Sequence, residues 1–305
     1  MAEESRPRRW VEHTVTEEEA GRTVQEILTG TLGVSRRMIQ RLTRAKGIHL
    51  NRRAPFLGKK VRTGDVVAAR LADDEESGLA PVEMELAIVH EDGDVLVLDK
   101  PPFLLVHPTS PEQTRTLAHG VAWHFARTGQ HHKVRPVHRI DRDTSGLVLF
   151  AKSSVTHARL DQQLRAGEIE RDYLALVGGT VDGEAGTVDA PIARHPRRPE
   201  LRMVRPEGEH AVTRWRVVER YPDATLLALV LETGRTHQIR VHMAHLGHPV
   251  LGDRPYGGRA VPGLKRQALH ASRLVFAHPT TGETMAFDSP LPEDLARVRQ
   301  SLQKG

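Results

Sequence analysis

Residues 137–152 of the chain read Val-His-Arg-Ile-Asp-Arg-Asp-Thr-Ser-Gly-Leu-Val-Leu-Phe-Ala-Lys. The second part, Leu147 to Lys152, is a short apolar run, which predicts a buried strand. The first part is the densest group of polar and charged residues in the chain, and it ends where that strand begins. The stretch therefore predicts a charged loop at the mouth of a buried strand, a position where functional residues are common.

Asp141 is the candidate reactive residue of this loop. Arg139 and Arg142 flank it, and nearby positive charge favours the ionised form of a carboxyl group. An ionised, partly desolvated aspartate serves as a nucleophile or a base. Two other interpretations stay open, namely an ordinary polar turn with surface ion pairs and a hydrolase-like carboxylate pair of Asp141 with Asp143.

Two more segments carry candidate residues. Tyr173, two residues after Arg171, is one of only three tyrosines in the chain. It lies on an expected strand over 173–177, where core packing with a hydrogen-bonded hydroxyl is the alternative. Arg240 lies on an expected helix over 237–246, from which a guanidinium can reach a buried carboxylate.

The same helix is expected to have Thr236 as its N-cap and to end before Gly247. Four histidines in and after it invite a metal interpretation: His237, His242, His245 and His248. We disfavour a metal site, because His237 and His242 are five residues apart and do not share one helical face. No acidic residue lies between the first and the last of the four.

The rest of the large C-terminal part indicates an α+β fold with a mixed sheet rather than a repeating βαβ fold, since regular helices do not separate most of the strands. Apolar runs between turn residues predict strands, which cover 86–90, 95–99, 147–152, 173–177, 212–218 and 224–231. Periodic segments predict helices over 117–127 and 154–166. Ser154 is expected to cap the second helix and Gly167 to stop it.

Composition excludes several classes of protein. The chain has 305 residues, 38% of them hydrophobic, which is enough for a real core and suggests about two domains. It has no cysteine, which excludes disulfide scaffolds, cysteine-ligated metal sites and thiolate nucleophiles. No apolar run approaches about 18 residues, and the N-terminus lacks the apolar stretch of a secretion signal. We therefore expect a cytoplasmic protein that does not bind a membrane.

Positive charge is concentrated near the N-terminus. Residues 1–72 hold 15 Lys and Arg against 8 Asp and Glu, a net of +7, whereas the whole chain carries +5. Ten of these basic residues, and no acidic one, lie between Ser35 and Gly64. Such a cationic segment predicts a polyanionic partner, with nucleic acid ahead of a merely solvated helix.

An acidic run, Asp-Asp-Glu-Glu-Ser-Gly at 73–78, follows the basic segment and is typical of a flexible linker. We therefore expect a small domain at 14–72, a linker at 73–84 and a large domain at 85–305. In the small domain the sequence predicts a basic helix over 36–45. Ser35 is expected to be its N-cap and Gly47 the left-handed residue after its end.

The small domain resembles the alpha-L RNA-binding motif, a module of a ribosomal small-subunit protein and of several RNA-modifying enzymes. The matching pieces are Val34 to Arg37, Leu42, Gly47 to Asn51 and Gly64 to Val66. Arg52 stands where a glycine is usual. The resemblance implies that basic residues bind the phosphates of structured RNA, which positions the protein without reading sequence. These residues are Arg36, Arg37, Arg41, Arg44, Lys46, Arg52 and Arg53.

The large domain resembles the RluA-type pseudouridine synthases over about residues 85–290. The segments that carry the resemblance are His138 to Gly146, Arg171 to Ala175, Gly234 to His242 and Gly247 to Asp253, with Asp99 to Pro102, Leu269 to Ala271 and His278-Pro279 at the two ends. Ile140 stands where leucine is usual, and Arg171 where lysine is common. An alpha-L module ahead of this domain is similar to the RluC and RluD branch, whose members modify large-subunit ribosomal RNA.

The resemblance implies an α+β pseudouridine synthase domain with a mixed or antiparallel sheet. The reaction detaches uracil from the ribose at N1 and rejoins it through C5, without a cofactor or a metal. The target uridine of a structured RNA is first extruded from its stack. The family's essential aspartate falls on Asp141, its arginine partner on Arg240, and the tyrosine that stacks on uracil on Tyr173.

The resemblance also implies substrate contacts and partners. Arg139 matches the residue that enters the space vacated by the extruded base, with Ile140, His138 and Ile239 as further substrate contacts. Large-subunit ribosomal RNA is the implied partner, and a monomer is the family expectation. The alternatives are a transfer-RNA target or a non-catalytic RNA-binding factor for ribosome assembly.

Overall fold

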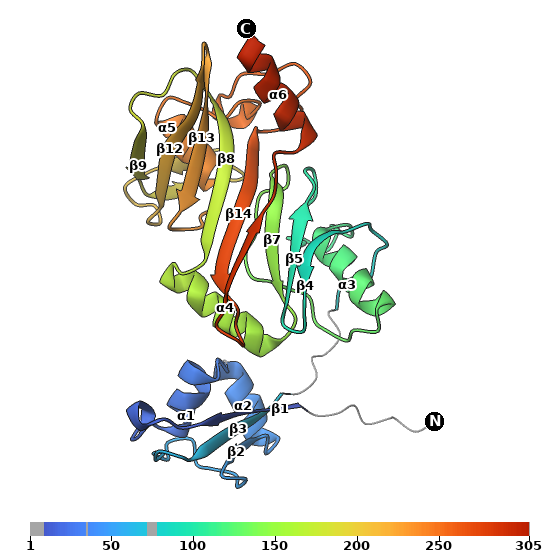
Figure 1. The fold of residues 1–305 in the computed structure, drawn as a ribbon, viewed down its shortest axis with the longest axis vertical. Helices are drawn as coiled ribbons and strands as arrows, with labels where there is room; N and C mark the ends of the chain where they lie inside the picture. Colours follow the sequence, from blue (N-terminus) through green and yellow to red (C-terminus); the bar gives the residue numbers. More distant parts are fainter. Residues whose placement is uncertain (1–8, 35, 72–77, 305) are drawn as a thin grey trace.

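The computed structural model describes residues 9–34, 36–71 and 78–304. Figure 1 shows a small N-terminal domain beside a large domain built on one extended sheet. Each domain has its own apolar core, one drawn from residues between Val15 and Ala69 and the others from residues after Val95. The expectations for Ser35 as a cap and for most of the acidic linker lie outside the described residues.

The small domain packs short helices on a three-stranded antiparallel sheet in the order β1-β3-β2. Its elements are β1 (Arg9–Thr14), η1 (Glu17–Glu19), α1 (Val24–Glu26), η2 (Ile27–Thr31), α2 (Arg36–Arg44), β2 (Ile48–Leu50) and β3 (Val66–Leu71). The basic helix matches the sequence prediction to within one residue. Strand β1 was not predicted, and it pairs with β3 along its whole length.

The end of α2 differs from the prediction by one residue. Lys46 has the left-handed conformation, with φ of 52°, and Gly47 does not. The helix stops at Arg44, so the left-handed position falls one residue before the glycine. Gly47 lies close to the helix, and a Cβ atom there would come within 3.0 Å of Leu42 Cδ2, so the leucine side chain would have to shift.

The large domain is built on a ten-stranded mixed sheet, which confirms the predicted α+β class. Eight strands follow the order β4-β5-β7-β14-β8-β13-β12-β9, while β6 pairs with β7 and β15 with β14. All pairs are antiparallel except β7 with β14. The strands are β4 (Ala87–Glu91), β5 (Val95–Lys100), β6 (Arg135–Pro136), β7 (Ser145–Ala151), β8 (Glu170–Gly178), β9 (Ala185–Asp189), β12 (Val212–Tyr221), β13 (Ala224–Leu231), β14 (Leu269–Ala277) and β15 (Thr284–Asp288), with a separate hairpin of β10 (Ile192–Arg194) and β11 (Arg202–Val204).

Helices cover both faces of the sheet at β7, and all seven residues of this strand are buried. Val148 and Phe150 share a core with α3, whereas Leu147 and Leu149 share another with Leu160 of α4. The helices are α3 (Leu117–Arg127), α4 (Ser154–Ala166), α5 (Gln238–His245) and α6 (Glu293–Lys304), with the short η3 (Arg254–Tyr256). None of the helices in the described ranges is long and apolar enough to cross a membrane.

The N-cap of α4 is Ser153 rather than the predicted Ser154. The Ser153 hydroxyl accepts a hydrogen bond from the backbone N–H of Thr156 at 3.0 Å. Both serines suit a cap, and the backbone decides between them, because only Ser153 has the extended conformation that an N-cap needs. Gly167 ends the helix in the left-handed conformation, as predicted.

The start of β7 places the charged loop. Gly146 has φ of +114°, and a Cβ atom there would lie 2.1 Å from the carbonyl oxygen of Ala271. Glycine therefore allows β14 to run in parallel beside the first residues of β7. The loop over 138–144 is thereby held at the end of two central strands.

Candidate active site

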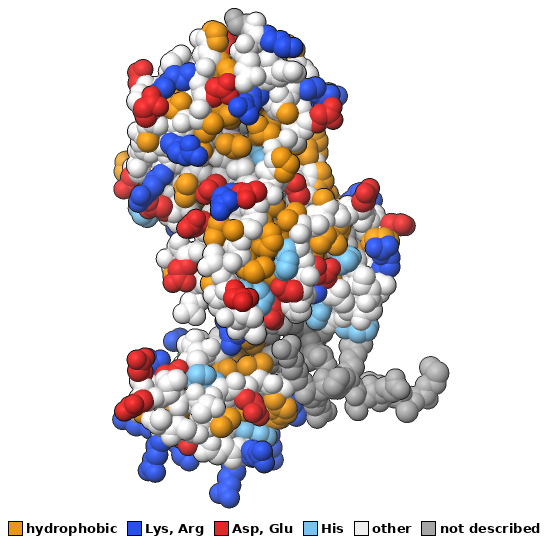
Figure 2. All heavy atoms as spheres, viewed as in Figure 1, with side chains coloured by type: hydrophobic (Ala, Val, Ile, Leu, Met, Phe, Trp, Pro, Cys, Tyr) orange, Lys and Arg blue, Asp and Glu red, His pale blue; other side chains and the backbone are white. Residues whose placement is uncertain are grey.

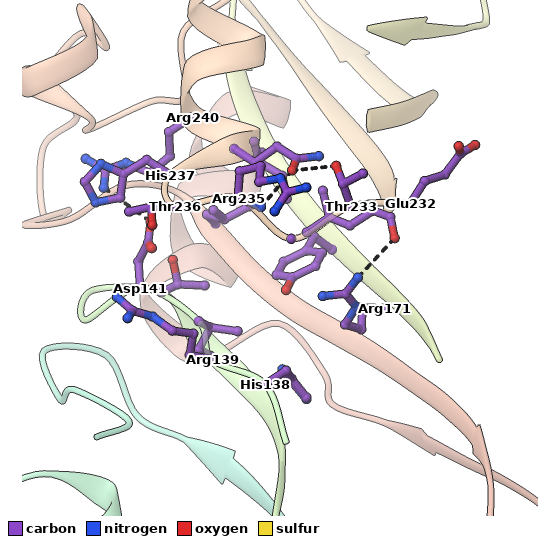
Figure 3. Close-up of a pocket in the computed structure, with 18 of the residues that line it drawn as sticks. His138, Arg139, Asp141, Arg171, Glu232, Thr233, Arg235, Thr236, His237 and Arg240 are labelled. Atoms are coloured by element: carbon purple, nitrogen blue, oxygen red, sulfur yellow. Dashed lines mark hydrogen bonds and ion pairs between the residues drawn. The ribbon is translucent and has the colours of Figure 1, made fainter. Parts of the chain in front are cut away.

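A cavity of about 500 Å³ opens beside the loop that precedes β7. Its walls come from that loop, from the start of β8, from the turn after β13 and from α5. The three candidate residues from distant segments, Asp141, Tyr173 and Arg240, all line it. Figure 3 shows the labelled side chains around this space. A cavity of this size suits one small ligand or one nucleotide.

Asp141 and Arg240 are in direct contact at one side of the cavity. Arg240 Nη1 donates a hydrogen bond to Asp141 Oδ2 at 3.3 Å. The principal partner of Arg240 is a residue that the sequence analysis did not single out, Asp253. Its two carboxylate oxygens accept from Nε at 2.6 Å and from Nη2 at 2.8 Å. The side chain of Asp253 is 1% exposed, against 18% for Asp141, so Asp253 holds the arginine and Asp141 faces the cavity.

The positive charge of Arg240 is fixed in place. Burial lowers the pKa of Arg240, but the hydrogen bonds and charge of Asp253, together with the charge of Asp141, more than offset this, so its pKa lies above the ordinary value. The ring of Tyr256 lies against the guanidinium, with 4.8 Å between Cζ and the ring centroid. The Tyr256 hydroxyl accepts from the backbone N–H of Arg202 and is 2.8 Å from His237 Nδ1. Arg240 therefore presents a permanent cation to Asp141.

Helix α5 begins one residue later than predicted, and its N-cap is His237 rather than Thr236. His237 is left-handed, with φ of 59°, and makes no side-chain cap bond. Gln238 closes the turn instead, because its Oε1 accepts from the backbone N–H of Arg235 at 2.9 Å and from Thr233 Oγ1 at 2.8 Å. This turn brings His237 to the cavity wall (Figure 3). Burial lowers the pKa of His237, which favours the neutral ring.

Tyr173 and Arg171 are two residues apart on β8, so they lie on the same face of the strand. Both line the cavity. Tyr173 is buried within the apolar core on one side. Burial raises the pKa of its hydroxyl, so the phenol stays protonated at neutral pH. Its ring is thus placed as a neutral wall of the cavity, and its role toward a base stays a prediction.

The other predicted substrate contacts also line the cavity. Arg139 is exposed at its mouth, while Ile140 and Ile239 are buried in its walls. The Nε2 atom of His138 accepts a hydrogen bond from the backbone N–H of Leu149 at 3.2 Å. Burial, assisted by the charge of Arg171, lowers the pKa of His138 to about 3, so this ring is neutral.

The geometry removes the support for a hydrolase-like carboxylate pair. Asp143 does not line the cavity, and its two oxygens accept from Arg142 at 2.7 and 3.1 Å. Lys100 is fully buried and stabilises the backbone of the loop, because its Nζ donates a hydrogen bond to the carbonyl oxygen of Arg142 at 2.9 Å. Burial lowers the pKa of Lys100 to about 7.

No group of three or more His, Asp or Glu side chains that could hold a metal ion is found among residues 9–34, 36–71 and 78–304. The buried ring of His242 has structural partners: Nδ1 lies 2.8 Å from Thr213 Oγ1 and Nε2 lies 2.9 Å from the carbonyl oxygen of Ala190. These contacts fix the inner face of α5 against the sheet.

The predicted RNA-binding residues all belong to the small domain. Figure 2 shows basic side chains along the edge of this domain that points away from the large one. Among the predicted residues, those that are exposed are Arg36, Arg41, Arg44, Lys46, Arg52 and Arg53. Arg37 belongs to α2, but its side chain is outside the described part. Arg52 has φ of 65°, which is the conformation that the usual glycine adopts readily.

Sequence reasoning missed Asp253 and Tyr256 as parts of the site. A signal for Asp253 existed, because it ends the matching segment Gly247 to Asp253. No signal pointed to Tyr256, since its position under Arg240 depends on the packing of η3 against α5.

The class of protein is indicated by the mixed sheet together with the partly buried contact of Asp141 with Arg240 beside a nucleotide-sized cavity. The family model described as RNA pseudouridylate synthase matches residues 94–245, which include Asp141, Tyr173 and Arg240. The chain belongs to this family and is an RNA pseudouridine synthase. It falls in the RluA-type group, in the branch of RluC and RluD.

Several curated proteins are similar over most of their length. An uncharacterized RNA pseudouridine synthase of Bacillus subtilis, YlyB, is 39% identical over 96% of this chain and 98% of its own. The ribosomal large subunit pseudouridine synthase D of Vibrio cholerae is 39% identical over 80% of this chain and 79% of its own. Among solved structures, human RNA pseudouridylate synthase domain containing 1 is 25% identical, covers 72% of this chain and 96% of its own, and has a TM-score of 0.55.

Proposed function

We propose that this enzyme isomerises uridine to pseudouridine in large-subunit ribosomal RNA and that Asp141 is the essential group. Similarity to several proteins named ribosomal large subunit pseudouridine synthase D supports the target. The contact of Asp141 with the clamped Arg240 inside the cavity carries the assignment of the residue.

The positions of the side chains support the proposed roles. Asp141 meets the extruded nucleotide at the ribose side, where Arg240 orients the carboxylate and stabilises its charge. Tyr173 stacks on the uracil, and its protonated phenol lies close to C5. Ile140, Ile239 and His138 pack around the nucleotide, and Arg139 occupies the space that the extruded base leaves in the RNA.

The small domain anchors the RNA in this proposal. Its exposed arginines and lysines bind phosphates, which fixes the orientation of the RNA without selecting a sequence. The selection of the uridine is then left to the large domain, in which one nucleotide enters the cavity.

Asp141→Asn tests the central assignment. This change keeps the size of the side chain and its contact with Arg240 but removes the charge. We expect pseudouridine formation to fall below detection in a tritium-release assay, while the Kd for RNA changes less than threefold. Asp223→Asn, which alters an exposed ion pair with Arg259, is the control and should keep full activity. Normal product formation by Asp141→Asn would refute the assignment.

The target is tested by mapping pseudouridines in total RNA from cells with and without the gene. Loss of one or more sites in large-subunit ribosomal RNA supports the proposal. Loss of pseudouridine sites only in transfer RNA would show that transfer RNA is the target. That result would contradict the proposed target but not the proposed chemistry.

We also propose that the enzyme acts as a monomer in the cytoplasm, where ribosomal RNA is available. Light scattering after gel filtration should then give a mass near 34.0 kDa, the mass of one chain. A mass of twice this value would contradict the monomer.

A further inference from the structure

Arg171 is a buried cation for which the described part of the chain provides no acidic partner. Three arginines are buried among these residues, Arg171, Arg240 and Arg266. Two of them bind a carboxylate through two nitrogens, Arg240 with Asp253 and Arg266 with Asp294. Arg171 makes a single long hydrogen bond instead, from Nη2 to the carbonyl oxygen of Leu231 at 3.4 Å. An unpaired buried charge is strongly unfavourable, so its retention calls for a ligand.

The donors of Arg171 are poorly satisfied by the rest of the described protein. Its Nε is buried without a hydrogen-bond partner. The guanidinium lies against the backbone of Gly234, where a Cβ atom would come within 3.0 Å of Nη1. The neighbouring wall residue His138 also has a buried nitrogen without a partner, Nδ1. Because Nε2 of His138 accepts from Leu149, Nδ1 carries the proton, and both residues offer donors rather than acceptors.

The position of Arg171 identifies the part of the substrate that it meets. Arg171 and Tyr173 are two residues apart on one face of β8, which separates them by about 6–7 Å. In Figure 3 Arg171 and Asp141 lie on opposite sides of the cavity. If Asp141 faces the ribose and Tyr173 stacks on the base, Arg171 meets the far edge of the base, which carries the carbonyl oxygens.

The reaction places negative charge at that edge. The C1′–N1 bond breaks with both electrons leaving on N1, and the charge of the detached uracil spreads to its two carbonyl oxygens. The new C1′–C5 bond then forms from the electron pair of the C5–C6 bond. The proton that C5 loses is balanced by the proton that N1 gains, so nothing is oxidised or reduced.

We propose that Arg171 is a catalytic residue that donates hydrogen bonds to a carbonyl oxygen of the departing uracil and stabilises its negative charge. A fixed cation in a site that excludes water is effective because it needs no reorganisation when charge develops. This inference rests on the proposed placement of Asp141 at the ribose. It assigns to β8 the stabilisation of the leaving group. Arg165 and Arg235 also line the cavity, but each is paired with a carboxylate at the surface, Asp161 and Glu209, respectively.

The test compares Arg171→Met and Arg171→Lys in the full-length protein, with RNA containing the target uridine. We expect Arg171→Met to lower the single-turnover rate of pseudouridine formation by about 10²–10³-fold, with the Kd for RNA within threefold of wild type. Arg171→Lys restores the charge and should recover at least tenfold of the loss. The melting temperature of Arg171→Met should not fall, since methionine removes an unpaired charge and keeps the apolar stem. Arg273→Met, which removes a guanidinium paired with Asp288 on the neighbouring strand, is the matched control.

A second arm varies the leaving group. Fluorine at C5 makes the uracil anion less basic, so its departure depends less on Arg171. In RNA with 5-fluorouridine at the target site, the rate deficit of Arg171→Met, followed as loss of 5-fluorouridine from nuclease digests, should shrink at least fivefold. An equal deficit for both bases would overturn the proposal. So would a deficit confined to the Kd, which would indicate phosphate binding, or a lower melting temperature without rescue by lysine, which would indicate a structural role.

The two proposals fail separately. If Asp141→Asn is inactive and Arg171→Met is normal, only the role of Arg171 is wrong. If Asp141→Asn is active, the assignment of Asp141 is wrong, whatever the behaviour of Arg171→Met.

Discussion

Asp253 positions Arg240 without lining the cavity, and this separation of roles can be tested. Asp253→Asn leaves the buried guanidinium without its charged partner, which costs about 3–5 kcal/mol of stability for a pair of this kind. Arg240 then turns toward Asp141, so we expect kcat to fall at least tenfold while the Kd for RNA is unchanged. Calorimetry and single-turnover assays measure the two effects. A lower melting temperature with a normal kcat would show that Asp253 serves only the fold.

The residues proposed to carry the chemistry could be singled out one by one as candidates, but their contacts could be predicted only in part. The residues alone left ordinary interpretations open, a polar turn for Asp141 and core packing for Tyr173. The resemblance of their segments to the family gave Asp141, Tyr173 and Arg240 their expected roles. The expected contact between Asp141 and Arg240 is present, but it is the weaker contact of this arginine. Asp253 and Tyr256 acquire their roles from three-dimensional neighbours, which local sequence does not encode.

At the scale of elements, the junction of β7 and β14 depends on Gly146. Gly146→Ala would place a methyl group 2.1 Å from the carbonyl oxygen of Ala271, at a φ that alanine rarely adopts. The two strands would have to separate, so we expect a loss of more than about 3 kcal/mol in the free energy of unfolding and loss of activity. Urea unfolding of the purified variant measures the loss in the free energy of unfolding. Gly93→Ala, in an open hairpin turn, is the control and should change stability by less than about 1 kcal/mol.

Elements with strong local patterns were predicted almost to the residue. The apolar periodicity of α3 and the continuous apolar run of β7 identify them from local sequence alone. Strand β1 was missed because it is short and polar on one side, and its partner β3 lies more than fifty residues away. The caps of α4 and α5 were each displaced by one residue, since the backbone conformation rather than the residue type selects the cap.

At the scale of the whole molecule, the basic surface of the small domain predicts a steep salt dependence of RNA binding. Changing Arg36, Arg44 and Arg53 together to glutamine removes three exposed charges. We expect the slope of log K against log salt concentration to decrease by about 2–3 units, with kcat unchanged at saturating RNA. Filter binding at several salt concentrations measures the slope.

The control for this experiment removes three exposed charges from the large domain. Arg214, Arg273 and Arg297 are paired on the surface with Glu232, Asp288 and Glu293, respectively. Their replacement by glutamine should leave the slope within about half a unit of wild type. Equal effects of the two triple variants would mean that the small domain is not the RNA anchor.

Buried histidines predict that the protein is sensitive to acid. Six imidazoles have a pKa lowered chiefly by burial: His119, His138, His157, His237, His242 and His270. Below pH 6.5 the unfolded chain binds protons at these positions and the folded protein binds fewer, so stability is complete above pH 6.5 and decreases on acidification.

The contribution of one histidine to this pH dependence can be tested at His138, whose pKa in the folded protein is about 3. Each such group adds up to about 1.4 kcal/mol per pH unit to the slope of stability between its two pKa values. We expect His138→Gln to reduce the pH dependence of the free energy of unfolding between pH 6 and 5, measured by urea unfolding. The reduction should correspond to about one proton fewer taken up on unfolding. An unchanged slope would contradict the neutral, buried state of this ring.

The parallel pairing of β7 with β14 joins Ser145 to His270, residues separated by 125 positions in the chain. During synthesis at about 5–20 residues per second, β7 therefore waits roughly 6–25 seconds for its neighbour. Throughout this interval the start of β7, at Ser145 and Gly146, lacks its pairing with β14 on the ribosome, and the loop with Asp141 lacks its support. Catalytic competence thus arrives only after β14 has been translated, and the nascent chain depends on protection from aggregation until then.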